Sequence, residues 1–130
     1  MPKRILIADD HATARQALRT AVSQREDWQV CAEAADGADA VEKAKTDNPD
    51  VVLIDLAIGG LNGFEAAEEI RAICPKAVVL AVSMHDPRAL LTSLQQIGVR
   101  GFVSKARIGT DLVPAIEATL AGRTWFRECE

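Results

Sequence analysis

The sequence has few cysteines, and their spacing excludes two common uses of that residue. Cys31, Cys74 and Cys129 are odd in number and far apart, and no Cys-x-x-Cys pair is present. Neither a disulfide framework nor a zinc site is therefore expected. Cys31 and Cys74 are interpreted instead as small apolar residues near core elements.

An excess of basic charge and long apolar runs are also lacking. The net charge is −4, so the electrostatic footprint of a nucleic-acid-binding domain is missing and no direct binding of DNA is expected. No apolar run is long enough to span a membrane. Met1-Pro2-Lys3-Arg4 leads straight into a short apolar run, with no signal peptide. We therefore expect a cytoplasmic protein that has no membrane segment.

Low-complexity segments and internal repeats are missing too, and the composition is that of one globular domain. The chain has 130 residues, of which 48% are hydrophobic and 26% are charged. This length and balance suit a single soluble domain. We place the domain at residues 1–122. Residues 123–130, which include Trp125 and Phe126, are interpreted as a C-terminal tail or the start of a linker.

Short apolar runs alternate along the chain with segments whose apolar residues recur at helical spacing. The runs predict strands over residues 4–8, 29–34, 51–54, 77–82 and 101–104. A helical segment follows each run after a short connection. Five such units in succession predict an α/β fold. The expected architecture is a doubly wound, five-stranded parallel sheet of the flavodoxin-like order 2-1-3-4-5, with helices on both faces.

Residues that cap or break helices mark the ends of the helical segments. Asn62 is a candidate N-cap for the third helix, and Glu65 would complete a capping box with it. Asp86-Pro87 predicts the start of the fourth helix, because proline suits the first helical position. Pro114 is expected in the first turn of the fifth helix, where backbone N–H groups lack helical partners.

Polar residues stand where four of the predicted strands end. They are Asp9 and Asp10 after the first strand, Asp55 after the third, Ser83 after the fourth and Lys105 after the fifth. In parallel sheets these ends meet at one edge, where ligands bind. Each residue alone has a plain structural explanation, such as a helix N-cap for Asp9 or a solvated surface position for Lys105. Their joint occurrence at four strand ends favours a functional site.

The chemistry of this set suits phosphoryl transfer. Three carboxylates held together repel one another unless a cation compensates them. Mg²⁺ suits such oxygen ligands and keeps several waters. Lys105 would add a second positive charge, and Ser83 a hydroxyl donor. Carboxylates form acyl phosphates, and cations neutralise the phosphoryl oxygens, so Asp55 is a candidate nucleophile.

Two histidines and one aromatic residue are weaker signals. His11 follows the acidic pair and is interpreted as a partly exposed residue at the start of the first helix, not as a metal ligand or phosphate relay. His85 is expected to be solvated in a loop, and neither histidine has a second histidine at metal-ligand spacing. Phe102 lies three residues before Lys105, and core packing is the default interpretation for it.

On these residues the sequence resembles the receiver domain of two-component response regulators. The resemblance covers nearly the whole chain. Four segments carry it: Ile7-Ala8-Asp9-Asp10-His11, Asp55-Leu56-Ala57 with the glycine-rich stretch that follows, Val82-Ser83, and Gly101-Phe102-Val103-Ser104-Lys105. From Ser83 to Trp125 the sequence is most similar to the NarL/FixJ type, whose receivers usually precede a helix-turn-helix DNA-binding domain.

The resemblance implies a role for each acidic residue. Asp55 would be the phosphoacceptor of a signalling switch, and the donor would be a histidine kinase or a phosphotransfer protein. Asp10, Asp55 and the backbone carbonyl of Ala57 would ligate Mg²⁺, and Asp9 would help through water.

The resemblance also implies how such a switch works. Ser83 and Lys105 would contact the phosphoryl group, and Phe102 would be the switch aromatic that turns inward as Ser83 moves. The domain would catalyse only its own phosphorylation and dephosphorylation. Its output would be a homodimer, formed through the face of the fourth helix, fifth strand and fifth helix or through the first and fifth helices. Otherwise it would control a DNA-binding domain that is not in this chain.

Three positions depart from the family pattern. Gly59 stands where proline is frequent, which predicts a more flexible loop after Asp55. Ala106 stands where proline often follows the lysine, and it argues against a cis peptide bond there because non-proline cis bonds are rare. Met84 is bulkier than the small residue often found after the switch serine. We hypothesise that it narrows access to the phosphoryl group and slows hydrolysis.

Three other functions remain as alternatives. A pseudo-receiver that binds partners without phosphorylation is supported only by the departures at Gly59 and Ala106. A phosphatase commonly needs a second acid two residues after its nucleophile, and Ala57 stands at that position. A flavin-binding module is disfavoured because no aromatic-rich loop is present and the carboxylates would repel the cofactor's phosphate.

Overall fold

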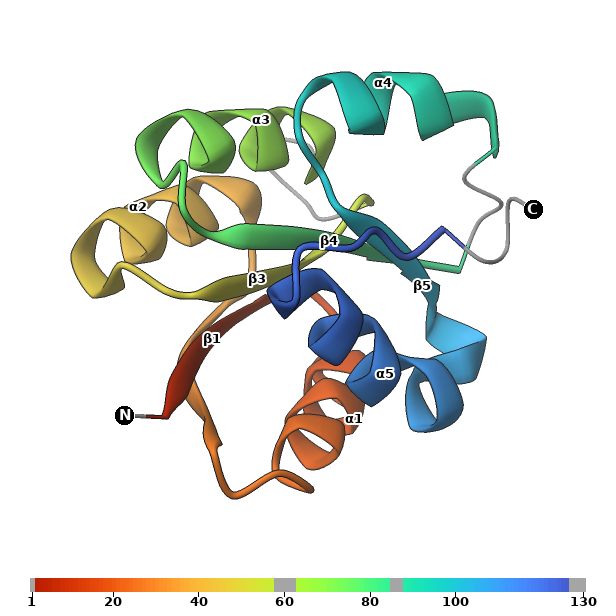
Figure 1. Ribbon diagram of the computed structural model, residues 1–130. Helices are drawn as coiled ribbons and strands as arrows, with labels where there is room; N and C mark the ends of the chain where they lie inside the picture. Colours follow the sequence, from red (N-terminus) through yellow and green to blue (C-terminus); the bar gives the residue numbers. More distant parts are fainter. Residues whose placement is uncertain (1, 58–62, 85–87, 127–130) are drawn as a thin grey trace.

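Five parallel strands form one sheet in the order β2-β1-β3-β4-β5, which confirms the predicted topology. The structure is a computed structural model that describes residues 2–57, 63–84 and 88–126. The strands are β1 (Lys3–Ala8), β2 (Trp28–Ala34), β3 (Val51–Asp55), β4 (Val78–Ser83) and β5 (Gly101–Ser104). Their ends differ from the predicted ends by one residue at most. Figure 1 shows the strands side by side between helices.

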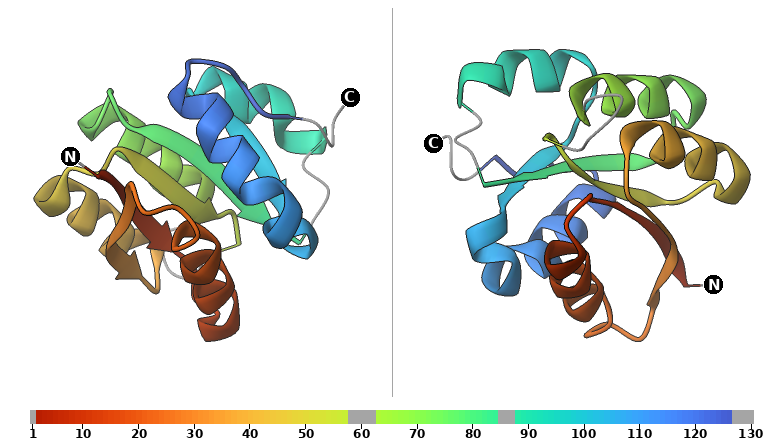
Figure 2. Two further views of the ribbon diagram at one scale, coloured as in Figure 1. Left: turned by 60° about the horizontal axis from the view of Figure 1, so that its bottom comes forward. Right: turned by 180° about the vertical axis from the view of Figure 1, so that it is seen from behind.

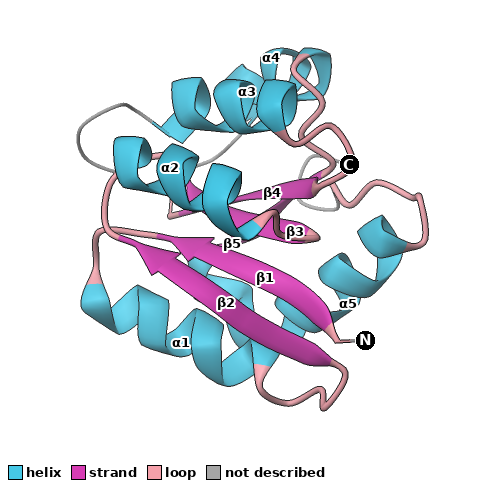
Figure 3. Cartoon of the chain, turned by 90° about the vertical axis from the view of Figure 1, so that its left-hand side faces the viewer, coloured by secondary structure: helices cyan, strands magenta, loops and turns pink. Residues whose placement is uncertain are grey.

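The helices form one layer on each face of the sheet (Figures 2 and 3). They are α1 (Ala12–Val22), α2 (Gly37–Asp47), α3 (Gly63–Ile73), α4 (Leu91–Gln96) and α5 (Ile108–Leu120). Short 3₁₀ turns precede α4 (Arg88–Leu90) and α5 (Lys105–Arg107). The side chains of α1 and α5 pack on one face, and those of α2, α3 and α4 pack on the other. Within the described ranges, no helix is long and apolar enough to cross a membrane.

The central strand β3 is buried along its whole length. Alternate side chains of a strand point to opposite faces of the sheet. Val52 and Ile54 accordingly join the core under α2, α3 and α4, whereas Val51 and Leu53 join the core under α1 and α5. Two covered faces explain why this segment is an unbroken apolar run. The strand therefore delivers Asp55 to the edge of the sheet from a well-packed support.

The prediction that Pro114 lies in the first turn of the last helix is wrong. Helix α5 begins at Ile108, so Pro114 lies inside it. Proline cannot donate a hydrogen bond to the carbonyl of Thr110, four residues earlier. Both residues are exposed, so water can reach that carbonyl. The helix starts early because Ile108 and Leu112 are both buried against the sheet and Arg107 pairs with Asp111 at 3.0 Å.

Several expectations fall on residues outside the described ranges. These are the cap at Asn62, the loop position Gly59, the solvated His85, the helix start at Asp86-Pro87, and Cys129. The other two cysteines are free thiols, with Cys74 buried and Cys31 partly buried. Burial raises the pKa of both thiols. This agrees with their interpretation as small residues near the core.

Candidate functional site

Four strand ends bring polar side chains to one edge of the sheet. Asp9 follows β1, Asp55 ends β3, Ser83 ends β4, and Lys105 follows β5. Three of them are nearly inaccessible: Asp9 is 0% exposed, Asp55 2% and Ser83 3%. Charged groups are seldom buried so completely unless they are paired or bind a ligand. The four residues lie together at the carboxyl ends of the strands, as the sequence predicts.

Lys105 is the cation that links the two buried aspartates. Its Nζ atom lies 2.8 Å from Asp9 Oδ2 and 3.0 Å from Asp55 Oδ2. Burial disfavours the charge on Lys105, but the attraction of the Asp9 and Asp55 carboxylates outweighs that effect and raises the pKa of Lys105. The ammonium group thus stays charged at neutral pH and holds both carboxylates beside each other.

The acidic residues form a cluster with the donor set of a cation site. Ligand atoms of Asp9, Asp10, His11 and Asp55 all lie within 4.8 Å of one another. Carboxylate oxygens at this spacing suit a hard divalent ion. Asp9 Oδ2 is buried and, among the described residues, has an ion pair with Lys105 but no directed hydrogen bond. One lysine facing three carboxylates leaves negative charge for a cation, so the residues fit Mg²⁺.

Backbone turns hold the two buried aspartates in place. Asp9 Oδ1 accepts a hydrogen bond from the His11 N–H at 2.9 Å, and Asp55 Oδ1 accepts one from the Ala57 N–H at 3.0 Å. In both bonds the carboxylate accepts from the backbone N–H two residues later, which is typical of Asp at the start of a turn. Asp9 is therefore not the N-cap of α1. That position belongs to His11, which makes no side-chain capping bond.

Asp10 and His11 occupy the exposed rim of the cluster. The side chain of Asp10 is 35% exposed, that of His11 is 68% exposed, and His11 Nδ1 lies 3.0 Å from Asp10 Oδ1. The interpretation of His11 as a partly exposed residue at the start of the first helix is confirmed. Sequence reasoning nevertheless missed its place within reach of the cluster, and the only signal available was its position directly after the acidic pair.

The proposed switch residues lie on neighbouring strands. Ser83 and Ser104 are partners in the β4–β5 register, and Phe102 pairs with Ala81. The ring of Phe102 is 1% exposed and belongs to the core under α2, α3 and α4. The structure thus holds this aromatic in the inward arrangement. The peptide bond after Lys105 is trans, as the presence of Ala106 predicts.

This combination of fold and site matches a known family. The family model of the response regulator receiver domain matches residues 5–117 of this chain. The chain belongs to this family. It is a response regulator receiver domain of a two-component system, as the resemblance in its sequence implied. Its homologues include response regulators of the NarL, DegU and VraR types.

Individual relatives agree with this assignment. Transcriptional regulatory protein DegU of Brevibacillus brevis is 30% identical over 123 residues, which are 95% of this chain and 52% of DegU. A LuxR-family two-component response regulator from Aurantimonas sp. SI85-9A1 has a TM-score of 0.91 and 34% identity, covering 99% of this chain and 96% of that structure. The signal receiver domain of a NarL response regulator from Mycobacterium tuberculosis has a TM-score of 0.86 and 34% identity, covering 94% and 98%.

The curated relatives are longer than this chain. The chain spans 52% of DegU and 56% of oxygen regulatory protein NreC of Staphylococcus epidermidis, which is little more than half of each.

Proposed function

We propose that this receiver domain is a phosphorylation-controlled switch in which Asp55 accepts a phosphoryl group. The donor is the phosphohistidine of a histidine kinase or of a phosphotransfer protein, and the setting is the cytoplasm. The observation that carries the proposal is the contact of the buried Asp55 carboxylate with Lys105 at 3.0 Å inside an acidic cluster. A nucleophile, a cation and a metal-binding set meet there at one strand end.

In the transfer step, an oxygen of Asp55 attacks phosphorus, the phosphorus–nitrogen bond to the donor histidine breaks, and an acyl phosphate forms on Asp55. Lys105 is positioned to pair with the phosphoryl oxygens, and Ser83 supplies a hydroxyl from the next strand. Asp10, Asp55 and the carbonyl of Ala57 would hold Mg²⁺, with Asp9 acting through water. When bound, Mg²⁺ neutralises charge on the phosphoryl oxygens.

The response to phosphorylation is a shift between two arrangements that already exist. The phosphoryl group brings nearly two negative charges. Ser83 and Lys105 move to meet it, and the inward position of Phe102 is favoured. The face made of α4, β5 and α5 then changes its preference for partners. The output is dimerisation, through this face or through α1 and α5, or control of a DNA-binding domain.

Two alternative functions predict different results. A pseudo-receiver would bind partners without accepting a phosphoryl group. A phosphatase would turn over a phosphomonoester, and it would commonly need an acid where Ala57 stands. The intact set of Asp55, Lys105 and the acidic cluster favours the switch over both.

The test is the intact mass of the chain after incubation with acetyl phosphate. The expected result is one added phosphoryl group that requires Mg²⁺ and is lost with chelator and in Asp55→Asn. Glu68→Gln on the exposed face of α3 makes the same chemical change away from the site and serves as the matched control. If folded wild type acquires no adduct from acetyl phosphate or from phosphohistidine donors, the switch is refuted and the pseudo-receiver is favoured.

A further inference from the structure

Residues 121–126, which follow α5, fold back onto the domain. Gly122 has a φ of +91°, a conformation that suits glycine. The Gly122 N–H donates to the Thr119 carbonyl at 3.1 Å, and the Arg123 N–H donates to the Ala118 carbonyl at 3.0 Å. This pair of bonds is the Schellman ending of a helix. It sends residues 123–126, which we name the strap, back along the sheet (Figure 1).

The strap pairs with the edge of β5 as a short additional strand. The Trp125 N–H donates to the Arg100 carbonyl at 3.0 Å, and the Phe102 N–H donates to the Trp125 carbonyl at 2.8 Å. Gly101 forms a parallel bridge with Trp125. A Cβ atom at Gly101 would lie 2.8 Å from the Trp125 carbonyl oxygen, so only glycine leaves room for this approach. The exposed edge of β5 is thereby covered.

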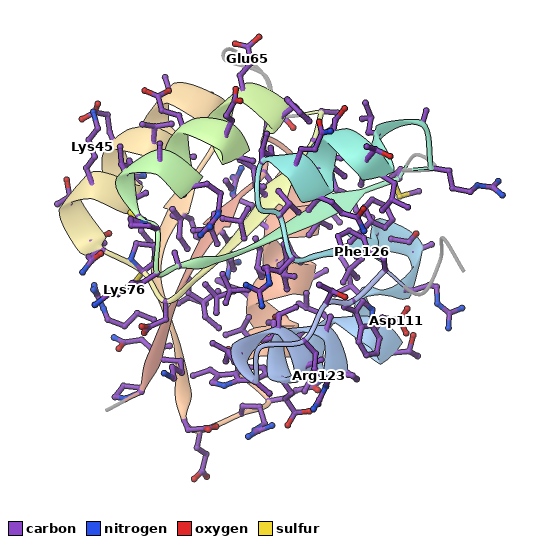
Figure 4. All side chains as sticks on the ribbon, turned by 45° about the horizontal axis from the view of Figure 1, so that its top comes forward. Lys45, Glu65, Lys76, Asp111, Arg123 and Phe126 are labelled. Atoms are coloured by element: carbon purple, nitrogen blue, oxygen red, sulfur yellow. The ribbon has the colours of Figure 1, made fainter. Side chains whose placement is uncertain are left out.

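The two aromatic side chains of the strap reach opposite faces of the sheet, as neighbours on a strand do. Trp125 packs against the core under α1 and α5. Phe126 is 8% exposed and belongs to the core under α2, α3 and α4, which also contains Phe102. Figure 4 labels Phe126 between α4 and α5. The strap therefore contacts the surroundings of Phe102 in two ways, through its backbone and through a shared core.

We propose that the strap is a positioning element that favours the inward arrangement of Phe102 and thereby links the phosphorylation site to the chain that follows. Phe126 belongs to the same core as the inward ring, and the Trp125 carbonyl accepts a hydrogen bond from the Phe102 N–H. Docking of the strap and phosphorylation of Asp55 favour the same arrangement, so each strengthens the other. This inference rests on the proposed function of Asp55.

Thermodynamic linkage between strap docking and phosphorylation gives this proposal a quantitative test. If the phosphorylated state favours the docked strap by some factor, loss of strap docking must weaken the phosphorylated state by the same factor. Couplings between sites are typically about fivefold or more. If the strap merely covers the sheet edge, its loss would lower the stability of both states equally and would leave this factor at one.

The experiment uses the full chain and beryllofluoride with Mg²⁺ as a phosphoryl mimic. Affinity is measured from the amide resonances around Asp55 in wild type, Phe126→Ala, Trp125→Pro and the exposed control Thr124→Ala. Trp125→Pro removes the N–H that donates to Arg100. Hydrogen exchange of the Trp125 amide is followed with and without the mimic, and the amide of Leu53 in the central strand serves to tell local opening at Trp125 from global unfolding.

The expected result is a reciprocal change. Beryllofluoride slows the exchange that occurs by local opening at Trp125 by about fivefold or more. Phe126→Ala and Trp125→Pro weaken beryllofluoride binding by a matching factor, Phe126→Leu restores most of it, and Thr124→Ala has wild-type affinity. If one strap variant does not fold, the other gives the affinity, and the exchange measurement needs only wild type.

Failure of this inference can be told apart from failure of the proposed function. If wild type does not bind beryllofluoride, both are refuted. If wild type binds it, but Trp125 exchange and variant affinities do not change, the strap is structural only. Tighter binding by the strap variants would mean that the docked strap opposes the phosphorylated state, which also overturns the inference.

Discussion

Gly63 lies directly against the backbone of Asp55: a Cβ atom on Gly63 would stand 2.2 Å from the Asp55 carbonyl oxygen and 2.5 Å from the Leu56 Cα. Real Cβ atoms essentially never lie within 3.0 Å of such backbone atoms, so the backbone itself would have to shift. Gly63→Ala should therefore displace the turn that carries Asp55, the proposed phosphoacceptor. We expect a loss of about 1–3 kcal/mol in the free energy of unfolding, the range for overpacking, together with reduced phosphorylation from acetyl phosphate.

Gly109→Ala is the matched control for this substitution. No atom lies within 4 Å of a Cβ at Gly109, which is exposed on α5. Alanine is the better helix former by about 1 kcal/mol, so this variant should be as stable as wild type or slightly more stable. Denaturant unfolding measures both changes. Equal stability of the two variants would contradict the steric role assigned to Gly63.

Mg²⁺ should stabilise the folded chain, because the carboxylate cluster proposed to bind it is assembled only in the folded chain. At a concentration one hundred times its dissociation constant, the gain is about 2.7 kcal/mol. Asp10→Asn should remove most of this gain, because Asp10 is one of the carboxylates of the cluster. Thermal unfolding with and without Mg²⁺ gives the result, with Glu68→Gln as the control. An undiminished gain in Asp10→Asn would place the ion elsewhere.

The ion pairs of Lys105 should contribute to stability up to alkaline pH. The pKa of Lys105 is raised above 10.5 in the folded chain, so its contribution is complete below that pH and is lost as pH rises through the folded pKa. Lys105→Met should cost on the order of 3 kcal/mol, because it leaves Asp9 and Asp55 buried without their cation. The difference from wild type should be constant from neutral pH to about pH 9.5 and shrink above about pH 10.5.

Lys43→Met tests whether this cost comes from burial. Lys43 pairs with Asp39 at 2.9 Å, a distance like those of Lys105, but both partners are about 40% exposed. An exposed pair contributes at most about 1 kcal/mol. Unfolding free energies of the two variants across pH make the comparison. A stability difference for Lys105→Met that disappears near neutral pH would show that its charge is not held by the aspartates.

Met84 should slow dephosphorylation of Asp55. Its side chain is 65% exposed and lines a 340 Å³ cleft together with His11 and Lys105, at the entrance to the site. Met84→Ala would open this approach for water, so the phosphorylated form should decay several-fold faster, with unchanged thermal stability. Leu90→Ala, another exposed apolar residue, is the control. If the decay rates of wild type and Met84→Ala are equal, the access hypothesis is wrong.

Much of the site could be predicted from the sequence because its residues stand at strand ends. Once the chain was seen to alternate between strands and helices, parallel pairing alone brought Asp9, Asp55, Ser83 and Lys105 to one edge. The five strand–helix units also predicted helices on both faces of the sheet, and these helices cover the strand that ends at Asp55. Those predictions depend on local patterns and on a rule of topology, and neither needs knowledge of side-chain packing.

Other features depended on contacts between residues far apart in the chain. Pro114 argued locally for a late helix start, but burial of Ile108 against the sheet moved the start earlier. In the sequence, residues 123–130 follow the glycine that ends the last helical segment and are interpreted as a tail or the start of a linker. Only the folded sheet offers the edge of β5 with which Trp125 pairs and the core that Phe126 enters.

The sequence by itself determined the order of the elements, the residues at the strand ends and the chemistry available there, because each follows from local spacing and residue type. The tertiary structure alone decided which carboxylates Lys105 pairs with, how close Gly63 comes to Asp55, and where the strap lies. These depend on distances between segments that are remote in the chain, and such distances are set when helices and sheet pack together.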